Sequence, residues 1–185
     1  TLINGAPGSG KDTAADYLRA LTGGYVEKLA KPIRDMIENI SPEVDPFGID
    51  GLPLEEMKDR TIADFSITHR QLMIDFSEEF IKPRFGHEWF AHVLAERLES
   101  LPRFAHVFVS DAGFQAEANY LIKRFGQRQV RTIRLLREGF EYADDSREYI
   151  RTMPMATVDN DGTLEKFEYK LEATFAHLWG YASYA

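Results

Sequence analysis

Apolar residues in this chain follow two patterns, short continuous runs and a recurrence every three or four positions, and each pattern predicts a different kind of element. Short apolar runs bounded by turn residues predict strands within residues 1–4, 23–31, 105–111, 129–136 and 155–158. Apolar residues that recur every three or four positions predict helices over residues 11–21, 32–40, 68–81, 87–101, 116–126 and 164–178. Because strands alternate with helices, we expect a three-layer α/β/α fold with a mainly parallel sheet covered on both faces.

One loop-rich stretch interrupts this alternation. Residues 41–53, SPEVDPFGIDGLP, are followed directly by renewed helical periodicity, so we interpret them as an insertion at the edge of a site and not as a linker. With 185 residues, of which 44% are hydrophobic, the chain can bury a substantial core as a single domain with insertions.

Charge narrows the class of partner. The formal net charge of -8 argues against nucleic acid and acidic membrane surfaces as partners, because both are bound through basic patches. Any ligand that carries phosphate must therefore be met by cations at particular positions.

The cellular compartment can also be predicted from composition. The chain contains no cysteine, which excludes disulfides and thiolate metal sites and fits a reducing cytoplasm. No apolar run reaches the roughly 18 residues of a membrane span, and no signal peptide is visible, so we expect a cytoplasmic protein. The chain begins at Thr1 without a methionine, and we expect the start of the first strand to lie upstream of the printed sequence.

A glycine-rich loop joins the first predicted strand to the first predicted helix. Gly5, Gly10 and Lys11 have the spacing G-x-x-x-x-G-K, and Gly8 and Ser9 are small residues between them. Small residues let successive backbone N–H groups turn toward a phosphate chain, while the lysine reaches the terminal phosphates and the helix adds its positive amino end. We therefore predict an ATP-binding loop. The alternative is a tight turn with a solvated lysine, which the flanking strand and helix disfavour.

The loop also resembles that of a known family. GAPGSGKDT resembles the phosphate loop of nucleoside monophosphate kinases, in which a non-hydroxyl residue follows the lysine and a threonine comes next, the position of Thr13. The form G-K-D-T resembles more narrowly the bacteriophage deoxynucleoside monophosphate kinases and, to a lesser degree, the phosphomevalonate kinases. LAKPIRD, THRQLMIDFSEEFIKPRFGHEWF, VFVSDAGFQAEA and VDNDGTLEKF follow in the order and approximate spacing of the phage-type enzymes, so the likeness covers most of the chain.

The resemblance implies a P-loop NTPase fold and an activity. The expected reaction transfers the γ-phosphoryl group of ATP, with Mg²⁺, to a deoxynucleoside 5′-monophosphate, in the host cytoplasm if a phage encodes the protein. A helical acceptor-binding segment is expected at about residues 32–104 and a lid at about residues 137–153.

Two alternatives to this function stay open. One is a P-loop kinase of another small phosphorylated acceptor, of the phosphomevalonate or dephospho-coenzyme A type. The other is a nucleotide-gated switch that turns ATP over slowly. The base that is accepted, the choice between ribose and deoxyribose, and the formation of a homodimer are also left open.

Asp12 is an unusual neighbour for a phosphate chain. Polyphosphate repels a carboxylate at this position unless magnesium, or a water on magnesium, lies between them. Asp12 is therefore a candidate metal partner through water, and a helix-start residue favoured by the helix dipole is the alternative. Asp111, at the end of a predicted strand, is a second candidate for magnesium through water, or for a substrate hydroxyl.

Arginines are the candidates for the charge neutralisation that phosphoryl transfer requires. The resemblance makes Arg70, in HRQLM, the preferred ligand of the acceptor phosphate, and Arg34 and Arg84 further ligands. The alternative for each is a solvated surface arginine.

A second arginine group lies in LLREGFEYADDSREYIR, which resembles the lid of these kinases. Arg137 is the preferred lid arginine and Arg147 the second, so that the predicted catalytic residues are Lys11, Arg137 and Arg147. The alternative is a surface salt-bridge cluster with Asp144 and Asp145.

Three further residues are candidate contacts of the acceptor. Glu79 and Glu117 could orient arginines or read the base, and Phe114 could stack on it; solvated helix faces and core packing are the alternatives. One departure from the family concerns the same place: where these kinases commonly have D-x-R-F, this chain has Gly113 in place of the arginine. The expected cation is either absent or supplied by another residue.

Overall fold

The computed structural model describes residues 1–40, 57–62, 66–142 and 146–180. The chain divides into two compact units, Thr1–Leu29 with Ala91–Ala185, and Ala30–Phe90, which are described one at a time. The loop-rich stretch 41–53 and the pair Asp144 and Asp145 lie outside the described residues.

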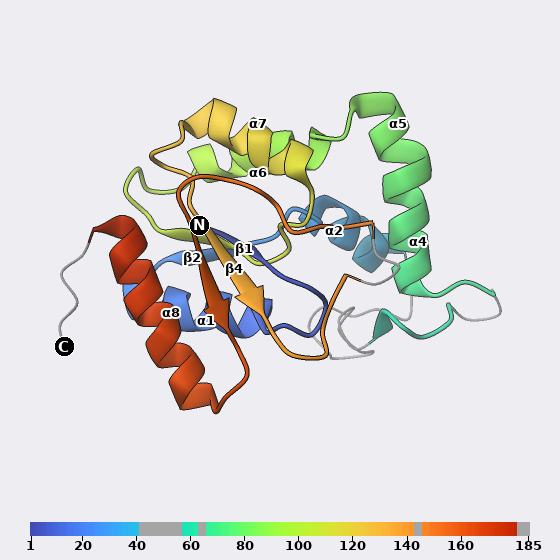
Figure 1. The fold of residues 1–185 in the computed structure, drawn as a ribbon. Coiled ribbons are helices and arrows are strands. Elements are labelled where there is room, and N and C mark those ends of the chain that lie inside the picture. The colour runs from blue at the N-terminus through green and yellow to red at the C-terminus, as the bar shows by residue number, and fades with distance from the viewer. Residues whose placement is uncertain (41–56, 63–65, 143–145, 181–185) are drawn as a thin grey trace. The chain divides into compact units, whose positions relative to one another are not determined.

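The first unit is built on a five-stranded sheet (Figure 1). Its strands are β1 Leu2–Asn4, β2 Tyr25–Glu27, β3 Val107–Val109, β4 Thr132–Leu136 and β5 Met155–Asp159, in the order β2-β3-β1-β4-β5. Every neighbouring pair is parallel, so the predicted α/β class with a parallel sheet is confirmed. Each observed strand overlaps a predicted one.

Helices cover both faces of this sheet (Figure 1). Helices α1 Lys11–Thr22 and α8 Leu164–Trp179 pack on one face, where Ala14, Leu18, Leu171 and Phe175 join Ile133 in one buried cluster. Helix α7 Gln115–Phe125 lies on the opposite face, and most of α6 Trp89–Glu99 also belongs to this unit. Burial of one apolar side of each helix against the sheet forms the core that holds the strand ends in place.

The second unit is helical. It contains α2 Lys31–Ile40, α4 His69–Asp75, the π-helix η1 Phe76–Ile81 and α5 Lys82–Phe85. The Thr68 side chain caps α4 by accepting from Gln71 N at 3.1 Å. The unit, Ala30–Phe90, covers most of the segment 32–104 that was expected to bind the acceptor, while residues 91–104 belong to the first unit.

The π-helix replaces part of the regular helix predicted over residues 68–81. Pro83 has no N–H to donate to the carbonyl of Glu79, and its ring would collide with that carbonyl in a regular helix. A wider turn relieves the collision. Arg84 then donates from Nη1 to Glu79 O at 3.1 Å and to Phe80 O at 3.2 Å, so a side chain supplies the donor that proline lacks.

No helix in the described part of the chain is long and apolar enough to cross a membrane.

Candidate phosphate-binding site

The loop between β1 and α1 has a backbone that requires glycine. Gly8 and Gly10 have φ values of 79° and 95°, which side chains of L-residues rarely adopt. A Cβ on Gly10 would also lie 2.6 Å from Asn160 Nδ2. Lys11 opens α1, and its Nζ donates to Ala6 O at 2.7 Å, so the ammonium group lies back across the loop. This arrangement brings a cation and a helix amino end to one turn of backbone.

Polar groups from other elements hold the loop on both sides. Tyr142 donates its hydroxyl to Gly5 O at 2.7 Å, and Asn160, which follows β5, donates from Nδ2 to Ser9 O at 3.0 Å. Gly5 and Ser9 are buried. Neither Tyr142 nor Asn160 was among the predicted site residues, although Asn160 is a polar residue two positions after the predicted strand 155–158.

The strand order accounts for the position of this loop. Strand β1 lies between β3 and β4, and the chain winds to one side of β1 first and to the other side later. In open parallel sheets, ligands bind beyond the carboxyl ends of the strands where the winding direction changes. The glycine-rich loop, Asp111, Arg137 and Asn160 all follow carboxyl ends of neighbouring strands in this sheet.

Arg137 lies directly on the phosphate loop. Its Nη1 donates to Gly8 O at 3.0 Å, and its guanidinium carbon lies 4.8 Å from the centroid of the Phe140 ring. A Cβ on Gly8 would lie 2.3 Å from Cε1 of Phe140, so the aromatic ring contacts the loop as well. The structure therefore brings together Lys11 and Arg137, two residues that the sequence analysis assigned to one reaction.

Asp12 has two partners that come from the ends of neighbouring strands. Its Oδ1 accepts from Ser110 Oγ at 2.7 Å and lies 3.0 Å from Nζ of Lys28. Ser110 follows β3 and Lys28 follows β2, and the last residues of these strands are paired in register. Thr13, the next residue of α1, is exposed. Lys28 was not among the predicted site residues, because only the pairing of β2 with β3 and the packing of α1 bring it to Asp12.

Asp111, Phe114 and Glu117 follow the same strand end. Asp111 Oδ1 accepts from Leu29 N at 2.8 Å and so joins the exit of β3 to that of β2. Glu117, in α7, is only 3% exposed, which rules out the solvated helix face considered for it. Phe114 is half-buried and precedes α7.

Residues 147–151, which we call the strap, cross the carboxyl ends of the strands and are held there by hydrogen bonds. Buried Asn4 donates from Nδ2 to Glu148 O at 3.0 Å and accepts at Oδ1 from Ile150 N at 3.1 Å. Gln115 accepts from Arg151 N at 2.7 Å and donates to Arg151 O at 3.0 Å. The second half of the predicted lid is thus held by side chains of β1 and α7.

Arg147 occupies the space above Gly113. A Cβ on Gly113 would lie 2.7 Å from Cγ and 2.8 Å from Cβ and Cδ of Arg147, and Glu148 N donates to Gly113 O at 2.8 Å. The glycine that departs from the family pattern therefore admits the aliphatic stem of another arginine. This packing places Arg147 beside the strand end that carries Asp111.

Gly113→Ala is expected to destabilise the protein by about 1–3 kcal/mol, because the added methyl group must displace the stem of Arg147 or the strap. Chemical denaturation followed by circular dichroism measures the change. Gly162→Ala is the matched control, since a Cβ there would meet only Lys166, at an ordinary contact of 3.5 Å. Equal losses in the two variants would contradict the packing described for Gly113.

The second unit holds the arginines predicted for the acceptor. Arg70 forms a two-pronged pair with Asp59, from Nε to Oδ1 and from Nη2 to Oδ2, the latter at 3.0 Å. The hydrogen bond from Arg70 holds the pKa of the Asp59 carboxyl below its ordinary value. Arg34 is half-buried in α2. An acceptor phosphate would have to compete with Asp59 for Arg70.

Arg84 and Glu79 lie on the surface of the same unit. The guanidinium carbon of Arg84 lies 4.2 Å from the centroid of the Phe80 ring, in addition to its bonds to the η1 carbonyls. The Glu79 side chain is exposed on η1. In this structure Arg84 therefore supports the π-helix, a role that the sequence analysis did not consider.

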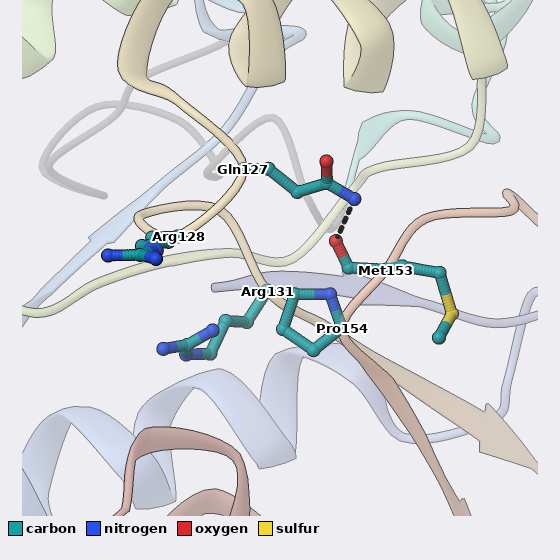
Figure 2. A pocket seen from close by; sticks show the side chains of 5 residues that line it. All are labelled: Gln127, Arg128, Arg131, Met153 and Pro154. Carbon is teal, nitrogen blue, oxygen red and sulfur yellow. Dashed lines mark hydrogen bonds between the residues drawn. The ribbon is translucent and has the colours of Figure 1, made fainter.

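Figure 2 shows a pocket elsewhere on the first unit, with a volume of about 400 Å³. It is lined by Gln127, Arg128, Arg131, Met153 and Pro154. Arg131 and Pro154 directly precede β4 and β5, so the pocket lies at the amino ends of these strands, away from the phosphate loop. It contains none of the predicted site residues.

No protein-family model matches this chain, and no curated protein matches it at a significant level.

Proposed function

We propose that this protein is a cytoplasmic, magnesium-dependent P-loop kinase that transfers the γ-phosphoryl group of ATP to a deoxynucleoside 5′-monophosphate, giving the diphosphate. The observation that carries the proposal is the meeting of Lys11 and Arg137 on one loop, each bonded to a loop carbonyl. Phosphoryl transfer needs such cations, because charge spreads over the transferred group in the transition state.

The residues of the site have distinct tasks in this proposal. The loop N–H groups and the amino end of α1 bind the phosphates of ATP. Lys11 leaves Ala6 O for the terminal phosphates, and Arg137, already at Gly8, stabilises the group in transfer. Arg147, packed on Gly113, adds positive charge beside the end of β3.

The side-chain oxygens near the start of α1 fit a magnesium site in which phosphate oxygens and water supply most of the ligands. Asp12, Thr13 and Ser110 offer carboxylate and hydroxyl oxygens, the ligand types that Mg²⁺ prefers. The described residues contain no group of three or more His, Asp or Glu side chains arranged for a metal ion. When bound, Mg²⁺ neutralises charge on the phosphates, and Asp12 orients water toward it.

An ADP-release assay with ATP, magnesium and a panel of nucleoside and deoxynucleoside monophosphates tests the proposal. Turnover that depends on a deoxynucleoside monophosphate supports it. Slow ATP hydrolysis without acceptor dependence would instead indicate a nucleotide-gated switch. Turnover with phosphomevalonate or dephospho-coenzyme A alone would indicate a kinase of another acceptor.

Arg70→Ala is expected to raise the KM for the monophosphate by about tenfold with little change in kcat, because an acceptor-phosphate contact is made equally in the ground state and the transition state. Steady-state kinetics at saturating ATP measures both constants. Exposed Arg60, in the same unit, provides the matched control, and Arg60→Ala should leave both constants unchanged. A rise in the KM for ATP alone would show that Arg70 does not bind the acceptor.

A further inference from the structure

The proposed function does not explain how the loop would bind a nucleotide without metal beside the negative charge of Asp12. Its carboxylate stands in the first turn of the helix that follows the phosphate loop, where a nucleotide without metal would repel it. The side chain is 63% exposed, so burial does not suppress its charge. Some other group must compensate this charge when no metal is bound.

Lys28 is placed to do this. Its Nζ lies 3.0 Å from Asp12 Oδ1, the same oxygen that accepts from Ser110 Oγ at 2.7 Å. The Lys28 side chain is 29% exposed, less than half the value for Asp12, so the ion pair is partly shielded from solvent. A pair of this kind is screened less than a pair on the open surface.

The backbone on both sides of Lys28 is fixed. Arg97 donates from Nη2 to Lys28 O at 2.6 Å and pairs with Glu27 at 3.0 Å. On the other side, Leu29 N donates to Asp111 Oδ1 at 2.8 Å. These hydrogen bonds fix the position of the Lys28 backbone at the end of β2. The side chain extends from that fixed position to Asp12.

We propose that Lys28 is a positioning residue that neutralises Asp12 and thereby lets the loop accept a nucleotide before metal is bound. This inference rests on the proposed function, since it assumes that the loop binds nucleotide phosphates. Lys28 acts through Asp12 and not by touching the phosphates. Because Lys28 acts mainly by holding the Asp12 carboxylate, its contribution should become much smaller when Asp12 carries no charge, leaving only the weak direct attraction between its ammonium group and the phosphates. It should also become small when magnesium accompanies the nucleotide.

The test is a double-mutant cycle on the binding of ADP without metal. Isothermal titration in EDTA compares the parent protein with Lys28→Met, Asp12→Asn and the double variant. Lys28→Met should bind ADP about fivefold more weakly, the scale of one uncompensated charge near the phosphates. Asp12→Asn should bind as well as the parent or slightly better. In the Asp12→Asn background, Lys28→Met should cost less than about twofold, because only the direct attraction between the ammonium group and the phosphates is then lost. With magnesium present, the deficit of Lys28→Met should fall below about twofold.

Lys123→Met is the matched control, because it removes the same charge from an exposed position in the last turn of α7. Melting curves of all variants establish that they are folded, and Lys28→Gln replaces Lys28→Met if the apolar side chain lowers the melting temperature. An equal loss of affinity from Lys28→Met in the parent and in the Asp12→Asn background would show that Lys28 acts on the phosphates independently of Asp12, which overturns the inference.

Two other results separate this inference from the proposed function. If the parent binds ADP and Lys28→Met binds it equally well, the inference is wrong and the proposed function stands. If the parent binds no ADP with or without magnesium, the nucleotide site itself is wrong, and the inference falls with it.

Discussion

Lys11→Ala is expected to lower kcat at least ~100-fold while leaving the fold intact, the scale of losing one preorganised charge contact in a phosphoryl-transfer site. In the structure the ammonium group donates to Ala6 O and so lies against the loop that we propose binds the phosphates. Its charge should act most strongly when negative charge builds up on the oxygen that bridges the β- and γ-phosphates, as the bond from that oxygen to the transferred group breaks. The ADP-release assay gives kcat, and circular dichroism checks the fold.

The control for Lys11 must remove a lysine without touching the loop. Lys123, exposed near the end of α7, meets this condition, and Lys123→Ala should keep the kcat of the parent. A folded Lys11→Ala protein with nearly normal turnover would eliminate the phosphate loop as the catalytic site.

Arg137→Ala is expected to lower kcat by about 100-fold with smaller changes in the KM values for ATP and monophosphate, because the arginine acts mainly on the transition state. The guanidinium group donates to Gly8 O and lies over the Phe140 ring, while Lys11 donates to Ala6 O in the same loop. Steady-state kinetics with each substrate varied in turn separates kcat from the two KM values.

Arg128 offers a matched control for Arg137. It is an exposed arginine of the same unit, in the pocket at the amino ends of the strands, so Arg128→Ala should leave kcat unchanged. Raised KM values with an unchanged kcat in Arg137→Ala would show that this residue binds substrate in the ground state and does not stabilise the transition state.

Much of the fold could be predicted from local pattern. Short apolar runs bounded by turn residues, and apolar spacings of three to four residues, depend only on residues close in sequence, and they located every observed strand and the main helices. The glycine-rich loop between β1 and α1 could also be predicted, because Gly8 and Gly10 are required by the backbone conformation of the turn itself. Lys11 is in the site for the same reason: it is the first residue of the helix that the loop begins.

The π-helix was not predictable from apolar spacing, because Leu72, Phe76 and Phe80 keep the four-residue steps of a regular helix. The physical cause is Pro83, which lies beyond the predicted end of that helix and affects the carbonyl four residues earlier. A proline so close to the end of a helical pattern was a signal that could have been used.

The side chains that contact one another within the site could not be predicted from the sequence, because only the tertiary structure brings them together. Asp12 meets Lys28 and Ser110 only because β2 and β3 are paired in register, and Asn4 meets Glu148 only because the strap crosses the end of β1. Such contacts join residues as far apart as 151 positions in the chain, the separation of Ser9 and Asn160, so no local spacing encodes them.

The sequence by itself therefore determined the α/β class, the loop and the identity of its lysine, since each follows from neighbouring residues. Only the tertiary structure decided which cation faces Asp12 and which side chain fills the space above Gly113. The reason is that the positions of the Lys28 ammonium group and of the Arg147 side chain depend on how distant strands and loops pack, and that packing depends on the whole core.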